Sequence, residues 1–305
     1  MLARRRNGRP VNGIIVIDKP KGLSSNDVVQ KAKRLYGARK VGHTGSLDPL
    51  ATGVLPLCFG EATKFSQFLL ASDKKYWVRI KLGVATETGD ADGDVISRSE
   101  ASHITRQDID RVLVAFRGEI QQVPSMYSAL KHNGQPLYKL ARQGIEVPRT
   151  ARFVQIYSNE VVGYEQAQIE LEIHCTKGTY IRTIAEDIGN ALKVGAHVTE
   201  LRRRSAGPFT ENDLITIEFL EKERENGSLD RFLMPTASAV GEWPEVRLSD
   251  ATSFYLKQGQ PVQVSHAPSS GWVRLSENDG QEVNFLGVGE VLDDGRVAPR
   301  RLVVN

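Results

Sequence analysis

The 305-residue sequence contains little sulfur and little tryptophan, with two cysteines, three methionines and three tryptophans. Cys58 and Cys175 lie far apart in apolar or strand-like stretches, so we expect reduced, buried thiols rather than a disulfide or a zinc site. The six histidines show no ligand spacing either. The sequence therefore predicts chemistry that uses no metal.

Long apolar stretches are also absent. No run of about 18 apolar residues exists, and the first ten residues lack the apolar core of a signal peptide. We therefore expect a cytoplasmic protein without membrane contact, and we expect it to be a monomer. Hydrophobic residues make up 40% of the chain and charged residues 25%, which is an ordinary globular composition. The length suits one large domain and one small domain.

The net charge of +3 says little about partners, but the charges are unevenly distributed. The first 40 residues carry eleven basic and two acidic side chains, whereas residues 211–230 carry two basic and seven acidic ones. A segregated basic surface suits a polyanion, because phosphate contacts supply salt-dependent affinity. For residues 1–10, which form a basic tail, a merely solvated charge run is the alternative explanation.

Residues 42–60 place one carboxylate, Asp48, in a loop crowded with residues that shape the backbone. Three glycines there permit unusual conformations, and Pro49 fixes the chain directly after the aspartate. The segment contains no lysine, which excludes a phosphate-binding P-loop. Leu50 stands where an aspartyl-phosphate enzyme would need a second acid. The remaining interpretations are a loop that holds Asp48 for chemistry and an ordinary Asx-type turn.

Hydrophobic periodicity predicts alternating strands and helices along most of the chain. A helix should begin at a cap formed by Ser24 or Ser25, and another at Thr105, which is followed by Asp108. The predicted strands are 13–18, 75–86, 153–162, 167–175 and 198–203, and the predicted helices are 24–37, 61–70, 105–117, 180–192 and 217–226.

Three alternating aspartates, Asp90, Asp92 and Asp94, resemble the start of a calcium-binding loop. Val95 occupies the position that needs glycine and Ala101 the position that needs a bidentate glutamate. We therefore interpret this stretch as a polar loop.

Residues 124–152 carry five basic side chains against one acid, interleaved with Tyr127, His132 and Tyr138. Such mixing suits RNA, since aromatic rings stack on bases and cations meet phosphates. An ordinary surface excursion would have a similar composition, so composition leaves both interpretations open.

Several ordered blocks extend the pattern around Asp48. They include Asp-Lys-Pro-Lys-Gly-Leu-Ser-Ser (18–25), Asp-Lys-Lys-Tyr (73–76), Pro-Ser-Met-Tyr-Ser-Ala-Leu-Lys (124–131), Lys-Gly-Thr-Tyr-Ile-Arg-Thr (177–183) and Leu-Arg-Arg (201–203). With residues 42–60, these blocks resemble the bacterial tRNA pseudouridine synthase B family, which isomerises a uridine in the T loop of tRNA, at position 55. The resemblance implies a metal-free and cofactor-free isomerase whose partner is the T-arm stem-loop of tRNA.

The resemblance also implies roles for individual residues. Asp48 would be the catalytic aspartate, Arg182 its charged partner, and Tyr76 the aromatic ring that stacks on the target base. A facing guanidinium should lower the pKa of Asp48 by roughly 1 to 3 units. Tyr180 and Leu201 would complete the apolar walls around the base.

Two further residues have less certain roles. His43 would reach the RNA by family analogy, although a histidine in a glycine loop can equally bond its own backbone. Lys19 either supports the loop or meets a phosphate, and the sequence does not separate these roles.

The fold implied is α+β, with a mixed, mainly antiparallel sheet in a catalytic domain at 11–247. Its insertion at 124–152 would grip the RNA, and a small PUA-like β-barrel at 248–305 would also bind RNA, through Arg296, Arg300 and Arg301. A non-catalytic RNA-binding or RNA-folding protein of the same architecture is the alternative function, and a synthase of the same fold acting on ribosomal or other RNA is a third.

Overall fold

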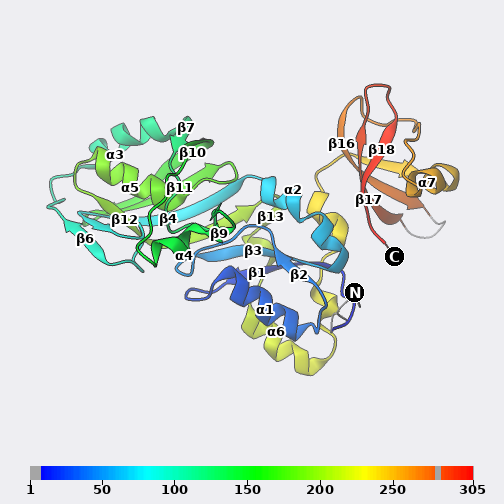
Figure 1. Ribbon diagram of the computed structural model, residues 1–305, viewed down its shortest axis with the longest axis horizontal. Coiled ribbons are helices and arrows are strands. Elements are labelled where there is room, and N and C mark those ends of the chain that lie inside the picture. Colours follow the sequence, from blue (N-terminus) through cyan, green and yellow to red (C-terminus); the bar gives the residue numbers. More distant parts are fainter. Residues whose placement is uncertain (1–7, 279–282, 305) are drawn as a thin grey trace.

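The computed structural model describes residues 8–278 and 283–304. Figure 1 shows a large body with strands and helices and a smaller, separate sheet at the C-terminal end of the chain. Residues 1–7, which hold most of the predicted basic tail, lie outside the described residues.

The large body is built on a ten-stranded sheet with the order β14-β1-β3-β12-β4-β11-β10-β7, to which β2 and β13 are added beside β3 and β12. All neighbours are antiparallel except the pairs β1–β14 and β3–β12. This mixed sheet confirms the predicted α+β class. The strands are β1 (Gly13–Lys19), β2 (Val41–His43), β3 (Thr52–Phe59), β4 (Lys74–Leu82), β7 (Gly118–Gln122), β10 (Arg152–Glu165), β11 (Gln168–Cys175), β12 (Ala196–Ala206), β13 (Phe209–Thr210) and β14 (Leu214–Ile215).

The main core lies between this sheet and helices on one of its faces. Those helices are α1 (Ser25–Leu35), α3 (Arg106–Leu113), α5 (Ile181–Ala191) and α6 (Ile217–Glu223). Both predicted capping boxes are present: Ser24 with Asp27 begins α1, and Thr105 with Asp108 begins α3. A second cluster packs α2 (Ser66–Ala71) and η6 (Thr236–Val240) against the opposite face of β1 and β3.

Several predicted elements are shorter than expected. The helix at 61–70 is divided into the 3₁₀ helix η1 (Gly60–Lys64) and α2, and the helix at 105–117 ends as the 3₁₀ turn η2 (Val114–Phe116). The strand at 75–86 breaks at Gly83, whose φ of 80° turns the chain into β5 (Val84–Thr86), paired with β6 (Val95–Arg98). Glycine adopts such a φ without the clash that other residues meet.

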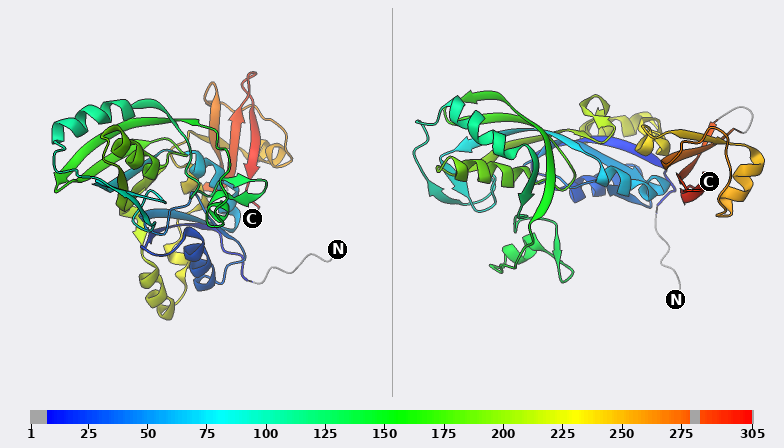
Figure 2. Two further views of the ribbon diagram at one scale, coloured as in Figure 1. Left: turned by 60° about the vertical axis from the view of Figure 1, so that its left-hand side comes forward. Right: turned by 90° about the horizontal axis from the view of Figure 1, so that it is seen from above.

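Residues 124–152 leave the body between β7 and β10. They form β8 (Lys131–His132), β9 (Gln135–Pro136) and α4 (Leu137–Ala141), and their small core consists of Met126, Leu137 and Leu140. The right-hand view of Figure 2 shows this green segment projecting from the rest of the molecule.

The C-terminal sheet contains β15 (Glu245–Leu248), β16 (Gly271–Asn278), β17 (Val283–Val291) and β18 (Val297–Leu302) in that order, with α7 (Asp250–Lys257) beside it. Its first strand thus begins before residue 248, where we had placed the boundary. The chain directly before this sheet is packed against both parts, because the Trp243 ring lies 4.8 Å from the Phe68 ring and 5.6 Å from the Trp272 ring, measured between centroids. The small sheet is therefore docked on the large body.

Two predictions about composition can be compared with the structure. Cys58 and Cys175 are both buried and unpaired, as predicted. Within the described residues, no helix is both long enough and apolar enough to cross a membrane.

The two halves of the large sheet meet where β3 runs parallel to β12. Only two residue pairs form this ladder, Thr52 with Arg202 and Gly53 with Arg203. Gly53 has a φ of 95°, and a Cβ atom there would overlap the Arg203 carbonyl oxygen. A residue without a side chain is thus required where the Asp48 loop joins the sheet.

We expect Gly53→Ala to lower the free energy of unfolding by about 3 kcal/mol, since positive φ costs about 1–2 kcal/mol and steric overlap adds about 1–3 kcal/mol. Gly22→Ala is the matched control, because Gly22 has a similar φ of 88° but open space around its Cβ position. Denaturant unfolding of both variants measures the difference. Equal losses would show that β3 and β12 do not need this close approach.

Candidate active site

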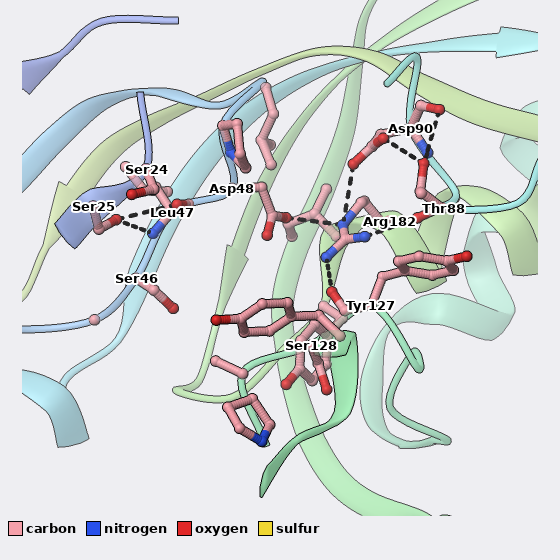
Figure 3. A pocket seen from close by; sticks show the side chains of 18 of the residues that line it. Ser24, Ser25, Ser46, Leu47, Asp48, Thr88, Asp90, Tyr127, Ser128 and Arg182 are labelled. Atoms are coloured by element: carbon pink, nitrogen blue, oxygen red, sulfur yellow. Dashed lines mark hydrogen bonds and ion pairs between the residues drawn. The ribbon is translucent and has the colours of Figure 1, made fainter. Parts of the chain in front are cut away.

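A cavity of about 1260 Å³ lies beside the junction of β3 and β12. It is lined by the Asp48 loop, the start of α1, the loop between β5 and β6, the insertion and the start of α5. Figure 3 shows Asp48 pointing across it toward Arg182. The structure thus brings together side chains that are far apart in the sequence.

The Asp48 loop is held on both sides of the aspartate. The Ser25 hydroxyl accepts a hydrogen bond from the Leu47 amide at 2.7 Å and donates one to the Leu47 carbonyl at 3.1 Å. On the other side, the Pro49 carbonyl accepts a hydrogen bond from the Gly22 amide at 2.8 Å. These contacts fix the backbone around Asp48.

Lys19 supports the same loop from inside the protein. Its side chain is fully buried, and its ammonium group donates hydrogen bonds to the carbonyls of Pro20, Pro49 and Ala51 at 3.0, 3.3 and 2.6 Å. Burial lowers the Lys19 pKa to about 8. Of the two roles considered for Lys19, loop support fits this geometry, and a phosphate contact does not.

Arg182 is the polar centre of the site. Its Nε lies 2.8 Å from Asp48 Oδ2 and 3.6 Å from Asp90 Oδ2. Its two terminal nitrogens donate to the carbonyls of Thr88 and Tyr127 at 2.8 and 2.9 Å. One guanidinium in the first turn of α5 therefore connects the Asp48 loop, the β5–β6 loop and the base of the insertion (Figure 3).

Asp90 is a buried residue of this site that the sequence interpretation missed. We treated it as part of a polar loop, but it is only 4% exposed. Its carboxylate accepts hydrogen bonds from the Thr88 hydroxyl at 2.5 Å and the Asp92 amide at 3.1 Å. Its burial depends on contact with β12 and Arg182, which no local pattern reveals.

The pKa of Asp48 does not shift in the predicted direction. Burial raises the pKa of this carboxyl, the Arg182 charge lowers it, and the Asp90 charge raises it again. The expectation that Arg182 would bring the pKa below its usual range is therefore wrong, because burial outweighs the guanidinium. The Asp48 side chain keeps 38% of its surface exposed to the cavity. A substrate that displaces water from this surface would raise the pKa of Asp48, as burial does.

Three predicted wall residues line the cavity with Asp48. Tyr76 comes from β4, Leu201 from the adjacent β12, and Tyr180 caps the N-terminus of α5. The Tyr180 ring centroid lies 4.6 Å from the central carbon of the Arg152 guanidinium, so a positive charge lies beside this part of the cavity wall. These surfaces provide the apolar and aromatic contacts that a planar base requires.

His43 also lines the cavity, although part of its side chain serves the loop. Its Nδ1 accepts a hydrogen bond from the Gly45 amide at 3.3 Å, which is the local backbone bond considered above. Burial, followed by the Arg203 charge, lowers the His43 pKa. The imidazole is therefore favoured in its neutral form.

The insertion contributes a basic edge to the same cavity. Lys131, Tyr138 and Arg142 line it, with the Arg142 guanidinium 5.7 Å from the Tyr138 ring centroid.

Within residues 8–278 and 283–304, no group of three His, Cys, Asp or Glu side chains is placed to hold a metal ion.

Sequence comparisons agree with this geometry. The profile of the TruB family pseudouridylate synthase N-terminal domain matches residues 33–181, and two TruB C-terminal profiles match residues 182–241 and 244–303. The chain is 55% identical to tRNA pseudouridine synthase B of Yersinia pestis (strain Pestoides F), over 99% of this chain and 95% of that protein. The chain belongs to the TruB family of pseudouridine synthases. It is therefore an isomerase that converts uridine to pseudouridine.

Other relatives and solved structures support this assignment. The identity to tRNA pseudouridine synthase B of Serratia proteamaculans (strain 568) is 54%, over 100% of this chain and 99% of that protein. A chain in the crystal structure of a Cbf5-Nop10-Gar1 complex superposes with a TM-score of 0.70 at 26% identity, covering 99% of this chain and 90% of that one. A chain in the structure of an H/ACA RNP bound to a substrate RNA containing 2′-deoxyuridine superposes with a TM-score of 0.72 at 24% identity. The match covers 99% of this chain and 92% of that one, and it shows the shared fold.

We expect Asp90→Asn to lower kcat about 10- to 100-fold, since a hydrogen bond to a charged group contributes about 1.5–3 kcal/mol. The amide can still accept the bonds from Thr88 and Asp92 but no longer carries the charge beside Arg182. Single-turnover kinetics and RNA binding, measured together, test this. The exposed Asp94→Asn in the same loop is the control, and a wild-type kcat in Asp90→Asn would contradict the role given to Asp90.

Proposed function

We propose that this TruB-family isomerase acts on tRNA, and that its target uridine lies in the T loop at position 55. The observation that carries the proposal is the contact between Asp48 and Arg182 inside a cavity large enough for a nucleotide. The relatives at 53–55% identity that share nearly the full chain are named as tRNA pseudouridine synthases B. The T loop is the substrate expected from the sequence resemblance.

The chemistry needs few parts, because the reaction only rearranges the nucleotide. The bond between C1′ and N1 breaks, the uracil turns, and C1′ bonds to C5. The proton that leaves C5 is balanced by the proton that N1 gains, so no external reactant is consumed. We propose that Asp48 starts this sequence by attacking C6 or C1′, or by removing a ribose proton. Each route requires the carboxylate form, which Arg182 favours.

The cavity walls then have to hold a base that has left its stack. Flipping a loop nucleotide costs a few kcal/mol, and stacking on an aromatic side chain returns about 1–3 kcal/mol per base. We propose that Tyr76 is this stacking surface, with Tyr180 and Leu201 closing the pocket around the uracil and His43 near its edge. All four line the cavity that contains Asp48.

The remaining RNA contacts would come from the insertion and the C-terminal sheet. We propose that Lys131 and Arg142 meet T-arm phosphates, because both face the cavity from the projecting segment. In the C-terminal sheet, Arg300 already pairs with Glu290 and Arg296 with Asp294, so Arg301 is the better placed of the three predicted contacts. We further propose a cytoplasmic monomer, since tRNA is a cytoplasmic substrate and one chain supplies every residue named here.

The test is pseudouridine formation in a T-arm stem-loop transcript, with EDTA present and no cofactor added. We expect wild-type protein to convert the T-loop uridine, and Asp48→Asn to lose about 10³-fold or more of the rate while still binding the RNA. A transcript of another tRNA arm is the substrate control.

Two results would contradict the proposal in different ways. Binding without conversion by wild-type protein would favour the non-catalytic RNA-binding alternative. Conversion of a ribosomal RNA fragment but not of the T-arm would keep the isomerase and replace its substrate.

A further inference from the structure

Arg203 is a buried cation in the cavity wall that the mechanism above does not use. It is 1% exposed, and its side chain is among the largest that the protein buries completely. Within the described part of the chain, Arg203 forms no ion pair with a carboxylate. Burying an unpaired charge is costly, so a purely structural site would be served better by a neutral side chain.

The hydrogen bonds of Arg203 connect it to the Asp48 loop. Its Nε donates to the Val54 carbonyl at 2.7 Å, and one terminal nitrogen donates to the Gly45 carbonyl at 3.1 Å. Gly45 lies three residues before Asp48. These bonds fix the plane of the guanidinium.

The strand register places Arg203 directly beside Tyr76. In the antiparallel pair of β12 and β4, Arg203 and Tyr76 are opposite each other, so both side chains leave the sheet on the same face. Both also line the cavity that contains Asp48. Burial raises the Tyr76 pKa, whereas the charge of Arg203 and a hydrogen bond from it act in the opposite direction.

We propose that Arg203 is a positioning residue for proton removal at uracil C5, acting through the Tyr76 hydroxyl. This inference rests on the pseudouridine synthase activity. After C1′ has bonded to C5, the Tyr76 hydroxyl releases its proton to solvent, and the resulting phenolate oxygen accepts the C5 proton. The C5–H electron pair restores the C5–C6 double bond. Arg203 holds the phenol oxygen in place and stabilises the negative charge that develops on it.

A deuterium at C5 of the target uridine separates this role from simple support of the loop. We expect Arg203→Gln to lower the single-turnover rate roughly 10- to 100-fold, within the range of general acid–base contributions. The C5 deuterium isotope effect should become larger than in wild type, because C5–H cleavage becomes slower than the preceding steps. RNA affinity should change less than twofold.

Arg204→Gln is the matched control on the same strand, since Arg204 is half-exposed and pairs with Glu172 away from the cavity. It should keep the wild-type rate and isotope effect. Arg203→Lys retains the charge, so it should recover part of the rate and return the isotope effect toward wild type. This variant also provides the comparison if the glutamine variant does not fold.

A roughly 10- to 100-fold rate loss in Arg203→Gln with an unchanged C5 isotope effect would overturn the proposal. Arg203 would then only support the Asp48 loop. A full rate in Arg203→Gln would overturn it as well. If the wild-type protein itself formed no pseudouridine from the T-arm, the substrate proposal would fail first, and that outcome is distinct from both.

Discussion

The contact between Arg182 and Asp48 is the interaction on which the rest of the site depends. Its geometry requires α5 to begin at the cavity, the Asp48 loop to be held by Ser25 and Lys19, and the β5–β6 loop to bring Asp90 to the same guanidinium. Because Arg182 also bonds the Tyr127 carbonyl, the base of the projecting insertion is part of this arrangement. The segment proposed to grip RNA therefore lies one hydrogen bond from the pair formed by Asp48 and Arg182.

Burial and direct polar contacts act against each other at Asp48 and at Lys19. Burial raises the pKa of Asp48 and lowers that of Lys19 to about 8, in each case disfavouring the charged form. Direct contacts oppose this effect of burial. Arg182 favours the charged carboxylate of Asp48, and three backbone carbonyls favour the charged ammonium group of Lys19. Electrostatic interactions in such a site become stronger when a bound base displaces water from it.

The sequence was informative wherever local rules determine structure, and less so where distant segments meet. Capping at Ser24 and Thr105 and the alternation in β4 follow from neighbouring residues, so they could be predicted. Asp48 stood out as the one carboxylate of its glycine-rich loop, but its expected role and its pairing with Arg182 came from family motifs rather than from geometry. Asp90 could not be recognised, because its burial arises only when the β5–β6 loop packs on β12. The direction of the Asp48 pKa shift was missed for the same reason, since it depends on how much water the folded cavity removes.

The central claim is that Arg182 maintains the Asp48 carboxylate against the effect of burial. The most direct test is an NMR pH titration of isotope-labelled aspartate, with the Asp48 signal assigned by its loss in Asp48→Asn. The account predicts a wild-type pKa above the ordinary value of 3.8 and a higher one in Arg182→Gln, so the carboxylate would be lost progressively as the pH falls through these values. A wild-type pKa at or below 3.8, or no change on removing Arg182, would contradict it.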